Sequence, residues 1–186
     1  MKKQPEITDA TRNAFIEAFC DFYATRPIEK ITVKEISQKA GYSRATFYNY
    51  FQDAYDLLEH VEDEFIASLV EKITYNIEHH QTMEYFVQTF VDLFKSKETY
   101  IKVFMNSANH SSFIQRLKTE AAPLLLAAFH VSMDNVKARY AFDFYISGLI
   151  PLIGTWLKNG QEIPAEDLAK LIKGILQDGI LKQFEE

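Results

Sequence analysis

The chain has 186 residues, of which 47% are hydrophobic and 25% are charged, a composition typical of a globular protein of one or two domains. Collagen, low-complexity disorder and disulfide scaffolds are excluded, and the single cysteine, Cys20, predicts a cytoplasmic protein with a buried thiol. The net charge of −6 is uneven, since residues 1–52 hold eight Lys and Arg against six Asp and Glu, and the rest carries −8. Only the N-terminal part is therefore suited to a polyanion.

No export signal or membrane span is expected. The first ten residues contain no apolar core of a signal peptide. The longest stretch without a charge, residues 144–157, is interrupted by Gly148, Pro151 and Gly154. It is also shorter than the roughly 20 residues that a membrane helix needs.

An apolar period of 3.6 residues recurs along most of the chain, which predicts an all-α fold of about nine helices. The first helix is expected over residues 8–25, because Pro27 stops it. A long fourth helix, capped by Asp53, extends to about residue 80 and can join two modules. Later helices are expected over residues 83–95, 97–107, 111–122, 123–131, 134–159 and 164–184.

Two short helices are predicted around a tight turn. Thr32 and Glu35 have the spacing of a capping box, which places the start of the second helix at Thr32. Gly41 is suited to the left-handed position that ends this helix, and Ser43 to the N-cap of a third helix over residues 44–50. The turn is therefore a three-residue segment that begins at Gly41.

A helix, a short turn containing Gly and a second helix is the arrangement that places the second helix in a DNA major groove. With Phe47 directed to the core, Arg44 is available to guanine and Asn49 to adenine, while hydroxyl groups are suited to phosphate oxygens. The alternative is an ordinary helical hairpin whose tyrosines pack on the fourth helix. The candidate DNA contacts are Thr32, Lys34, Ser43, Arg44, Ala45, Thr46, Tyr48, Asn49 and Tyr50.

The segment ITVKEISQKAGYSRATFYNYF resembles the N-terminal helix-turn-helix signature of the TetR family of one-component transcriptional regulators. The resemblance covers residues 8–60. A later segment, residues 144–160, is similar to the penultimate helix of the C-terminal domain of TetR-type regulators of Gram-positive bacteria. The matching positions of the signature are Thr32, Ile36, Ala40, Gly41, Ser43, Thr46, Tyr48 and Phe51.

The resemblance implies a helix-turn-helix DNA-binding domain over residues 1–53 and an effector-binding and dimerisation domain over residues 54–186. It also implies a homodimer, formed through the last two helices, on a pseudo-palindromic operator in double-stranded DNA. A ligand-responsive repressor is the expected function, although the sequence leaves an activator open. The apolar character of both last helices agrees with a shared interface, and an intrachain core is the alternative.

One position departs from the family pattern. At the start of the fourth helix the family usually has Lys in a pattern F-x-x-K, whereas this chain has Ala54 at that place, preceded by Asp53. DNA affinity is then weaker, or it is carried by Lys34, Arg44 and the N-terminal lysines. This departure keeps open a second hypothesis, a TetR-fold coactivator or adaptor that binds another protein.

The C-terminal part contains aromatic and thioether side chains at helical spacing, which are typical either of a core or of a cavity wall. A cavity with this lining would bind a small apolar or aromatic effector. The candidate pocket residues are Phe65, Phe86, Phe90, Phe104, Met105, Phe129, Tyr140 and Phe144.

Neither a cofactor nor a metal is expected, and the protein is not predicted to be an enzyme. The adjacent pair His79 and His80 projects about 100° apart on a helix, which prevents joint chelation. The segment around Ser43 superficially resembles a nucleophile elbow, but an elbow requires a preceding strand and a capped helix is expected there.

Overall fold

The computed structural model describes residues 5–97, 99–100, 110–128, 130–132 and 134–180, and all regular structure within them is helical. The all-α prediction is confirmed, with a number of helices close to nine. The chain divides into two compact units, an N-terminal unit of Met1–Glu64 and Thr99–His110 and a C-terminal unit of Phe65–Glu98 and Ser111–Glu186.

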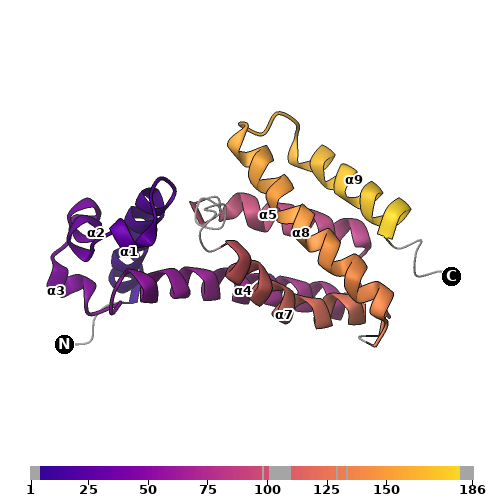
Figure 1. Ribbon diagram of the computed structural model, residues 1–186, viewed down its shortest axis with the longest axis horizontal. Coiled ribbons are helices and arrows are strands. Elements are labelled where there is room, and N and C mark those ends of the chain that lie inside the picture. Colours follow the sequence, from indigo (N-terminus) through magenta and orange to yellow (C-terminus); the bar gives the residue numbers. More distant parts are fainter. Residues whose placement is uncertain (1–4, 98, 101–109, 129, 133, 181–186) are drawn as a thin grey trace. The chain divides into compact units, whose positions relative to one another are not determined.

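The N-terminal unit contains α1 (Pro5–Tyr23), the 3₁₀ helix η1 (Ile28–Lys30), α2 (Val33–Ala40), α3 (Arg44–Phe47) and the first part of α4 (Ala54–Glu78). Helix α2 packs against both α1 and α3 (Figure 1). Phe15, Phe19, Tyr23 and Phe47 are fully buried and form an aromatic core. The Phe15 and Phe47 rings meet edge to face at 5.2 Å, which joins α1 to α3.

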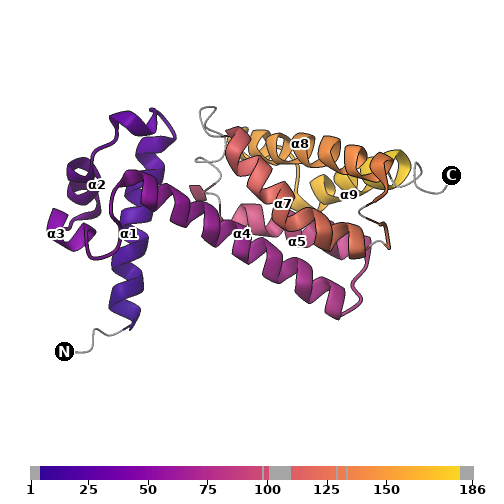
Figure 2. The ribbon, with the colours of Figure 1, turned by 60° about the horizontal axis from the view of Figure 1, so that its bottom comes forward.

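The C-terminal unit contains the rest of α4 and four further α-helices, which are α5 (Met83–Ser96), α7 (His110–Ala128), α8 (Val136–Lys158) and α9 (Ala165–Ile175). A π-helical segment, η2 (Leu176–Ile180), follows α9. Helix α5 packs against α9 and α8 (Figure 2), and Lys173 Nζ lies 2.7 Å from Glu84 Oε2 across the first pair. Phe65 packs on Phe94 and Phe113, with ring centroids 5.1 and 5.8 Å away, at the centre of this core.

The C-terminal unit differs from the prediction in two places. The last helix, expected over residues 164–184, is α-helical over Ala165–Ile175 and continues as the π-helical η2. The helices expected over residues 111–122 and 123–131 are a single helix, α7, with Pro123 inside it. Leu117 and Ala121 before the proline and Leu126 after it are all buried, so the packing of one helix face continues across the interruption. The helix expected over residues 97–107 lies largely outside the described residues.

Two features are absent from the part of the chain that the structure describes. None of its helices is long and apolar enough to cross a membrane. Nor do three or more His, Cys, Asp or Glu side chains come together there in a group that can hold a metal ion.

Candidate nucleic-acid interface

The start of α2 is fixed by the predicted capping box. Thr32 Oγ1 accepts the backbone N–H of Glu35 at 3.3 Å, and Glu35 Oε2 accepts the N–H of Thr32 at 3.0 Å. Glu35 Oε1 also accepts from Arg26 Nη1 at 2.9 Å. Hydrogen bonds from the Thr32 side chain, from Arg26 and from the Thr32 N–H lower the pKa of Glu35 from 4.5 to about 2.

The turn between α2 and α3 is equally well specified. Gly41 has φ of +78°, a left-handed conformation that strains other residues, and the N–H of Tyr42 donates to the carbonyl of Ser37 at 2.9 Å. Ser43 Oγ then accepts the N–H of Thr46 at 3.1 Å as the N-cap of α3. The three local predictions for this segment, at Thr32, Gly41 and Ser43, are confirmed.

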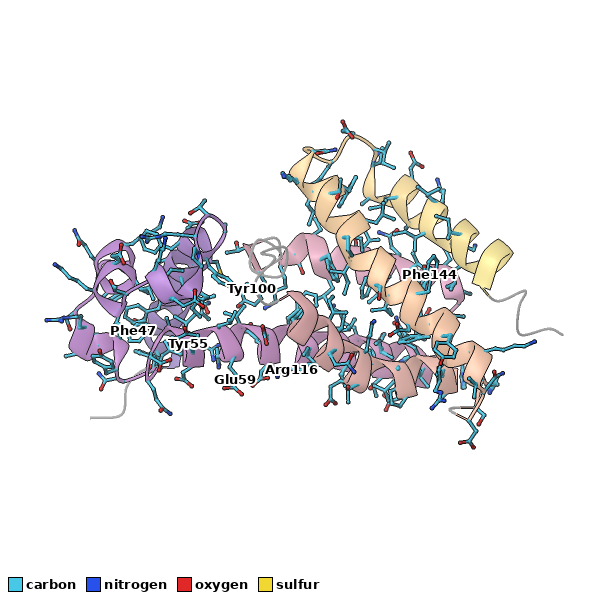
Figure 3. All side chains as sticks on the ribbon, in the orientation of Figure 1. Phe47, Tyr55, Glu59, Tyr100, Arg116 and Phe144 are labelled. Carbon is cyan, nitrogen blue, oxygen red and sulfur yellow. The ribbon has the colours of Figure 1, made fainter. Side chains whose placement is uncertain are left out.

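The burial of Phe47 sets the orientation of α3. Its ring lies inside the N-terminal unit, 5.2 Å from that of Phe15 and 5.6 Å from that of Phe51 (Figure 3). Helix α3 ends at Phe47 instead of Tyr50, and residues 49 and 50 continue in tighter turns through bonds to the carbonyls three residues earlier. Helix α3 therefore packs on the core of the N-terminal unit through the side of Phe47, and its opposite side, with Arg44 and Ala45, is exposed.

The candidate DNA contacts differ in exposure. Tyr50 and Thr46 are half-buried, and the Tyr50 ring packs 6.0 Å from that of Phe15. Tyr48 retains 58% of its exposure. The other candidates are all exposed, and they are Thr32, Lys34, Ser43, Arg44, Ala45 and Asn49.

The cations of the N-terminal unit fall into two groups. Arg26 pairs with Glu35 and Lys39 with Asp21, each at 2.9 Å. Lys30, Lys34 and Arg44 are exposed and have no such partner within the described residues. Of these, Lys34 lies on α2 and Arg44 on α3, where both remain available to an anionic partner.

The start of α4 carries negative charge. Asp53 Oδ1 accepts the N–H groups of Tyr55 and Asp56 at 2.8 and 2.9 Å, and Asp56 Oδ2 accepts that of Gln52 at 2.7 Å. These two carboxylates thus accept the free N–H groups at the start of α4, which would otherwise be available to an anion such as a DNA phosphate. Ala54 is buried, whereas Tyr55 on the same turn is exposed (Figure 3), a detail that sequence spacing did not reveal.

A second candidate site is a cavity of about 90 Å³ within the C-terminal unit, lined from α4, α5, α7, α8 and α9. Phe86 and Phe90 line it, as do Lys72, Asn76 and Tyr145, which sequence reasoning missed because polar residues lack a periodic signal. Burial raises the pKa of Tyr145, and its hydroxyl donates to the carbonyl of Ile172 at 3.3 Å.

The other residues expected at a pocket lie elsewhere. Phe65 is fully buried against aromatic rings and does not line the cavity. Tyr140 and Phe144 are 75% and 78% exposed and are not part of its wall. Phe104, Met105 and Phe129 lie outside the described residues.

The capped turn, the outward polar surface of α3 and the unpaired cations Lys34 and Arg44 define a helix-turn-helix DNA-binding protein. Family models agree: one described as bacterial regulatory proteins, tetR family, matches residues 7–61, and one described as transcriptional regulator C-terminal region matches residues 81–178. The chain belongs to the TetR family of bacterial transcriptional regulators, which are not enzymes.

Several known proteins are similar to the chain. The uncharacterised HTH-type transcriptional regulator YxbF of Bacillus subtilis (strain 168) is 25% identical over 126 residues, or 65% of this chain. The matched chain spans only 33% of the length of that relative.

Two solved structures of regulators named FadR share the fold. The fatty acid degradation regulator of Bacillus halodurans has a TM-score of 0.72 at 16% identity, covering 97% of this chain and 98% of its own. FadR of Bacillus subtilis in complex with stearoyl-CoA has a TM-score of 0.68 at 18% identity, covering 90% of this chain and 98% of its own. Identities this low are informative about the fold alone.

Proposed function

We propose that the protein is a homodimeric, ligand-responsive regulator that binds a pseudo-palindromic DNA operator through two copies of α3. The observation that carries the proposal is the surface around α3, where Phe47 is buried and Arg44 is exposed without an ion-pair partner in the described residues. An arginine at the N-terminus of a recognition helix can form two hydrogen bonds to a guanine. In this proposal Lys34, Ser43 and Tyr48 bind phosphate oxygens.

We assign dimerisation to the last two long helices. Tyr140 and Phe144 on α8 and Leu171 and Ile175 on α9 are large apolar side chains that stay exposed in the isolated chain. Exposed apolar surface of this kind is typical of a protein interface. In a two-fold dimer each of these helices meets its own copy, which also duplicates the DNA-binding surface.

We assign effector binding to the cavity in the C-terminal unit, within a proposed effector domain over residues 54–186. Its lining is largely apolar, which favours a small apolar molecule. The complex of a structural relative with stearoyl-CoA, whose acyl chain is apolar, supports the same class of ligand. The effector acts by population shift between two conformations of the dimer that differ in the spacing of the two α3 helices. It must bind one conformation more tightly than the other, because a ligand with equal affinity for both shifts nothing.

The alternative, an adaptor that binds another protein, is favoured by the carboxylates of Asp53 and Asp56 at the start of α4. One experiment separates the two functions. Fluorescence anisotropy measures the affinity for a DNA fragment from the region that flanks the gene, at several salt concentrations, with a shuffled fragment as control.

A DNA-binding regulator prefers the flanking fragment, and log affinity falls linearly with log salt, with a slope of about −0.9 for each phosphate contacted. Equal, salt-insensitive association with both fragments, or none at all, contradicts DNA recognition and favours the adaptor. A double variant with Lys34→Gln and Arg44→Gln should lose most of its DNA affinity in the same titration. That result would assign DNA binding to α2 and α3.

A further inference from the structure

Asn76 is a buried polar residue in the wall of the cavity. It lies on the α4 segment of the C-terminal unit and is only 2% exposed. Its Oδ1 is shielded from solvent and accepts no hydrogen bond from the described residues. A buried amide oxygen without a hydrogen-bond donor costs free energy of folding, so an unpaired oxygen at this position calls for an explanation.

The neighbouring polar groups do not satisfy this amide. Tyr145 donates its hydroxyl hydrogen to the carbonyl of Ile172 instead. Lys72, one helical turn before Asn76, also lines the cavity but is exposed. Thr89, which is half-buried, also lines the cavity, and the rest of the wall is mostly apolar, with Ile73, Phe86 and Phe90 among its residues. Asn76 is therefore a buried polar residue with an unpaired oxygen in a largely hydrophobic wall.

We propose that Asn76 determines effector specificity, and that the effector is an apolar molecule with one neutral hydrogen-bond donor, a hydroxyl or an amide N–H, placed against Asn76 Oδ1. This inference rests on the proposed effector function of the cavity and adds the chemistry of its ligand. A hydroxyl is especially suited, because it both donates and accepts and so pairs with either orientation of the amide. An alkyl ligand of equal size leaves the amide unpaired.

A pair of size-matched probes tests the assignment. 1-Hexanol and 1-fluorohexane have the same chain, but only the alcohol can donate a hydrogen bond. Their dissociation constants for the full chain are measured by NMR titration, and the quantity of interest is the ratio of the two constants. A ratio cancels general effects of a substitution on cavity size or apolarity.

The main variant is Asn76→Leu, which has nearly the same volume and no hydrogen-bonding group. We expect this change to shift the ratio against the alcohol by roughly tenfold, the effect of one lost hydrogen bond to a buried group. Asn13→Leu, the same substitution at an exposed position of α1, should leave the ratio unchanged. An unchanged ratio in Asn76→Leu, or no binding of 1-hexanol to the wild type, overturns the inference.

Two further readouts separate this role from a structural one. Because the amide oxygen is buried and unpaired, Asn76→Leu should raise the melting temperature of the ligand-free protein. A lower melting temperature with an unchanged ratio would identify Asn76 as a structural residue. Asn76→Ala provides the same comparison of probes if the leucine variant does not fold. DNA affinity is measured on the same samples. If Asn76→Leu leaves the ratio of the two dissociation constants unchanged while DNA binding is intact, only the role of Asn76 is contradicted. A ratio effect without DNA binding contradicts only the proposed regulator.

Discussion

Glu35 fixes the start of α2, the first helix of the helix-turn-helix. Its carboxylate accepts hydrogen bonds from Thr32 and Arg26 and so links the start of α2 to the segment before η1. Because these partners favour the ionised form, its pKa in the folded protein is about 2, against 4.5 for an unperturbed Glu. Stability therefore depends on this charge.

The lowered pKa predicts a defined acid sensitivity. The stabilisation from ionised Glu35 is fully present above about pH 4.5 and is lost as the pH falls towards 2, since the unfolded chain takes up the proton first. Glu35→Gln should therefore reduce the free energy of unfolding at pH 7, and the difference from wild type should shrink between pH 4.5 and 2. Urea unfolding across this pH range measures it, and a difference independent of pH would show that the charge is unimportant.

Arg44 and Tyr48 are expected to have different roles on DNA. Arg44→Ala should weaken binding to the preferred operator by about 1–3 kcal/mol and relax the sequence preference, because it removes a base contact. Tyr48→Phe should weaken binding to all sequences alike, since only a phosphate contact is lost. Anisotropy titrations with operator variants test both, and an Arg44→Ala protein that kept its full preference would refute the base contact.

At the scale of elements, helix ends were predictable where a few neighbouring residues determine them. Thr32, Gly41 and Ser43 act through bonds that span three to five residues, so spacing alone identified them. The helix break predicted at Pro123 was wrong. The buried residues before and after the proline keep α7 continuous, and this tertiary effect cannot be inferred from local sequence. The carboxylate cap of α4 was predicted only in part, since Asp56 also folds back to Gln52.

The start of α4 provides a prediction about charge. Asp53→Asn should raise DNA affinity a few-fold at low salt, because it removes a negative charge while the amide oxygen can still accept the N–H groups of Tyr55 and Asp56. The increase should fade at high salt. Asp134→Asn, in the C-terminal unit, is the matched control, and equal effects of the two substitutions would contradict a local role for Asp53.

At the scale of the whole molecule, the sequence could not sort its aromatic residues among core, cavity and surface. Phe65, Phe86 and Phe144 all belong to regular apolar patterns, yet one is in the core, one lines the cavity and one is exposed. Their fates depend on how each helix is rotated against its neighbours, which only tertiary packing decides. The turn and the two short helices around it were easier to predict, because the residues that form them are contiguous in sequence.

The exposure of Phe144 leads to a prediction about assembly. Phe144→Glu should convert a dimer into a monomer at micromolar concentration, with the dimer dissociation constant raised at least about 30-fold, because a charge would be buried in an apolar interface. Tyr85→Glu, at another exposed aromatic position, should leave the dimer intact. Sedimentation equilibrium measures both proteins, and a Phe144→Glu dimer of unchanged affinity would remove α8 from the interface.

The most direct measurement is methylation interference on the DNA fragment that the protein prefers. Guanine N7 lies in the major groove and adenine N3 in the minor groove, so one reagent reports on both. The account predicts interference at guanine N7 in two symmetric half-sites about one helical turn, or a multiple of a turn, apart, and Arg44→Ala should abolish it at one guanine in each half-site. Interference confined to adenine N3, or absent at every guanine, would contradict the placement of α3 in the major groove.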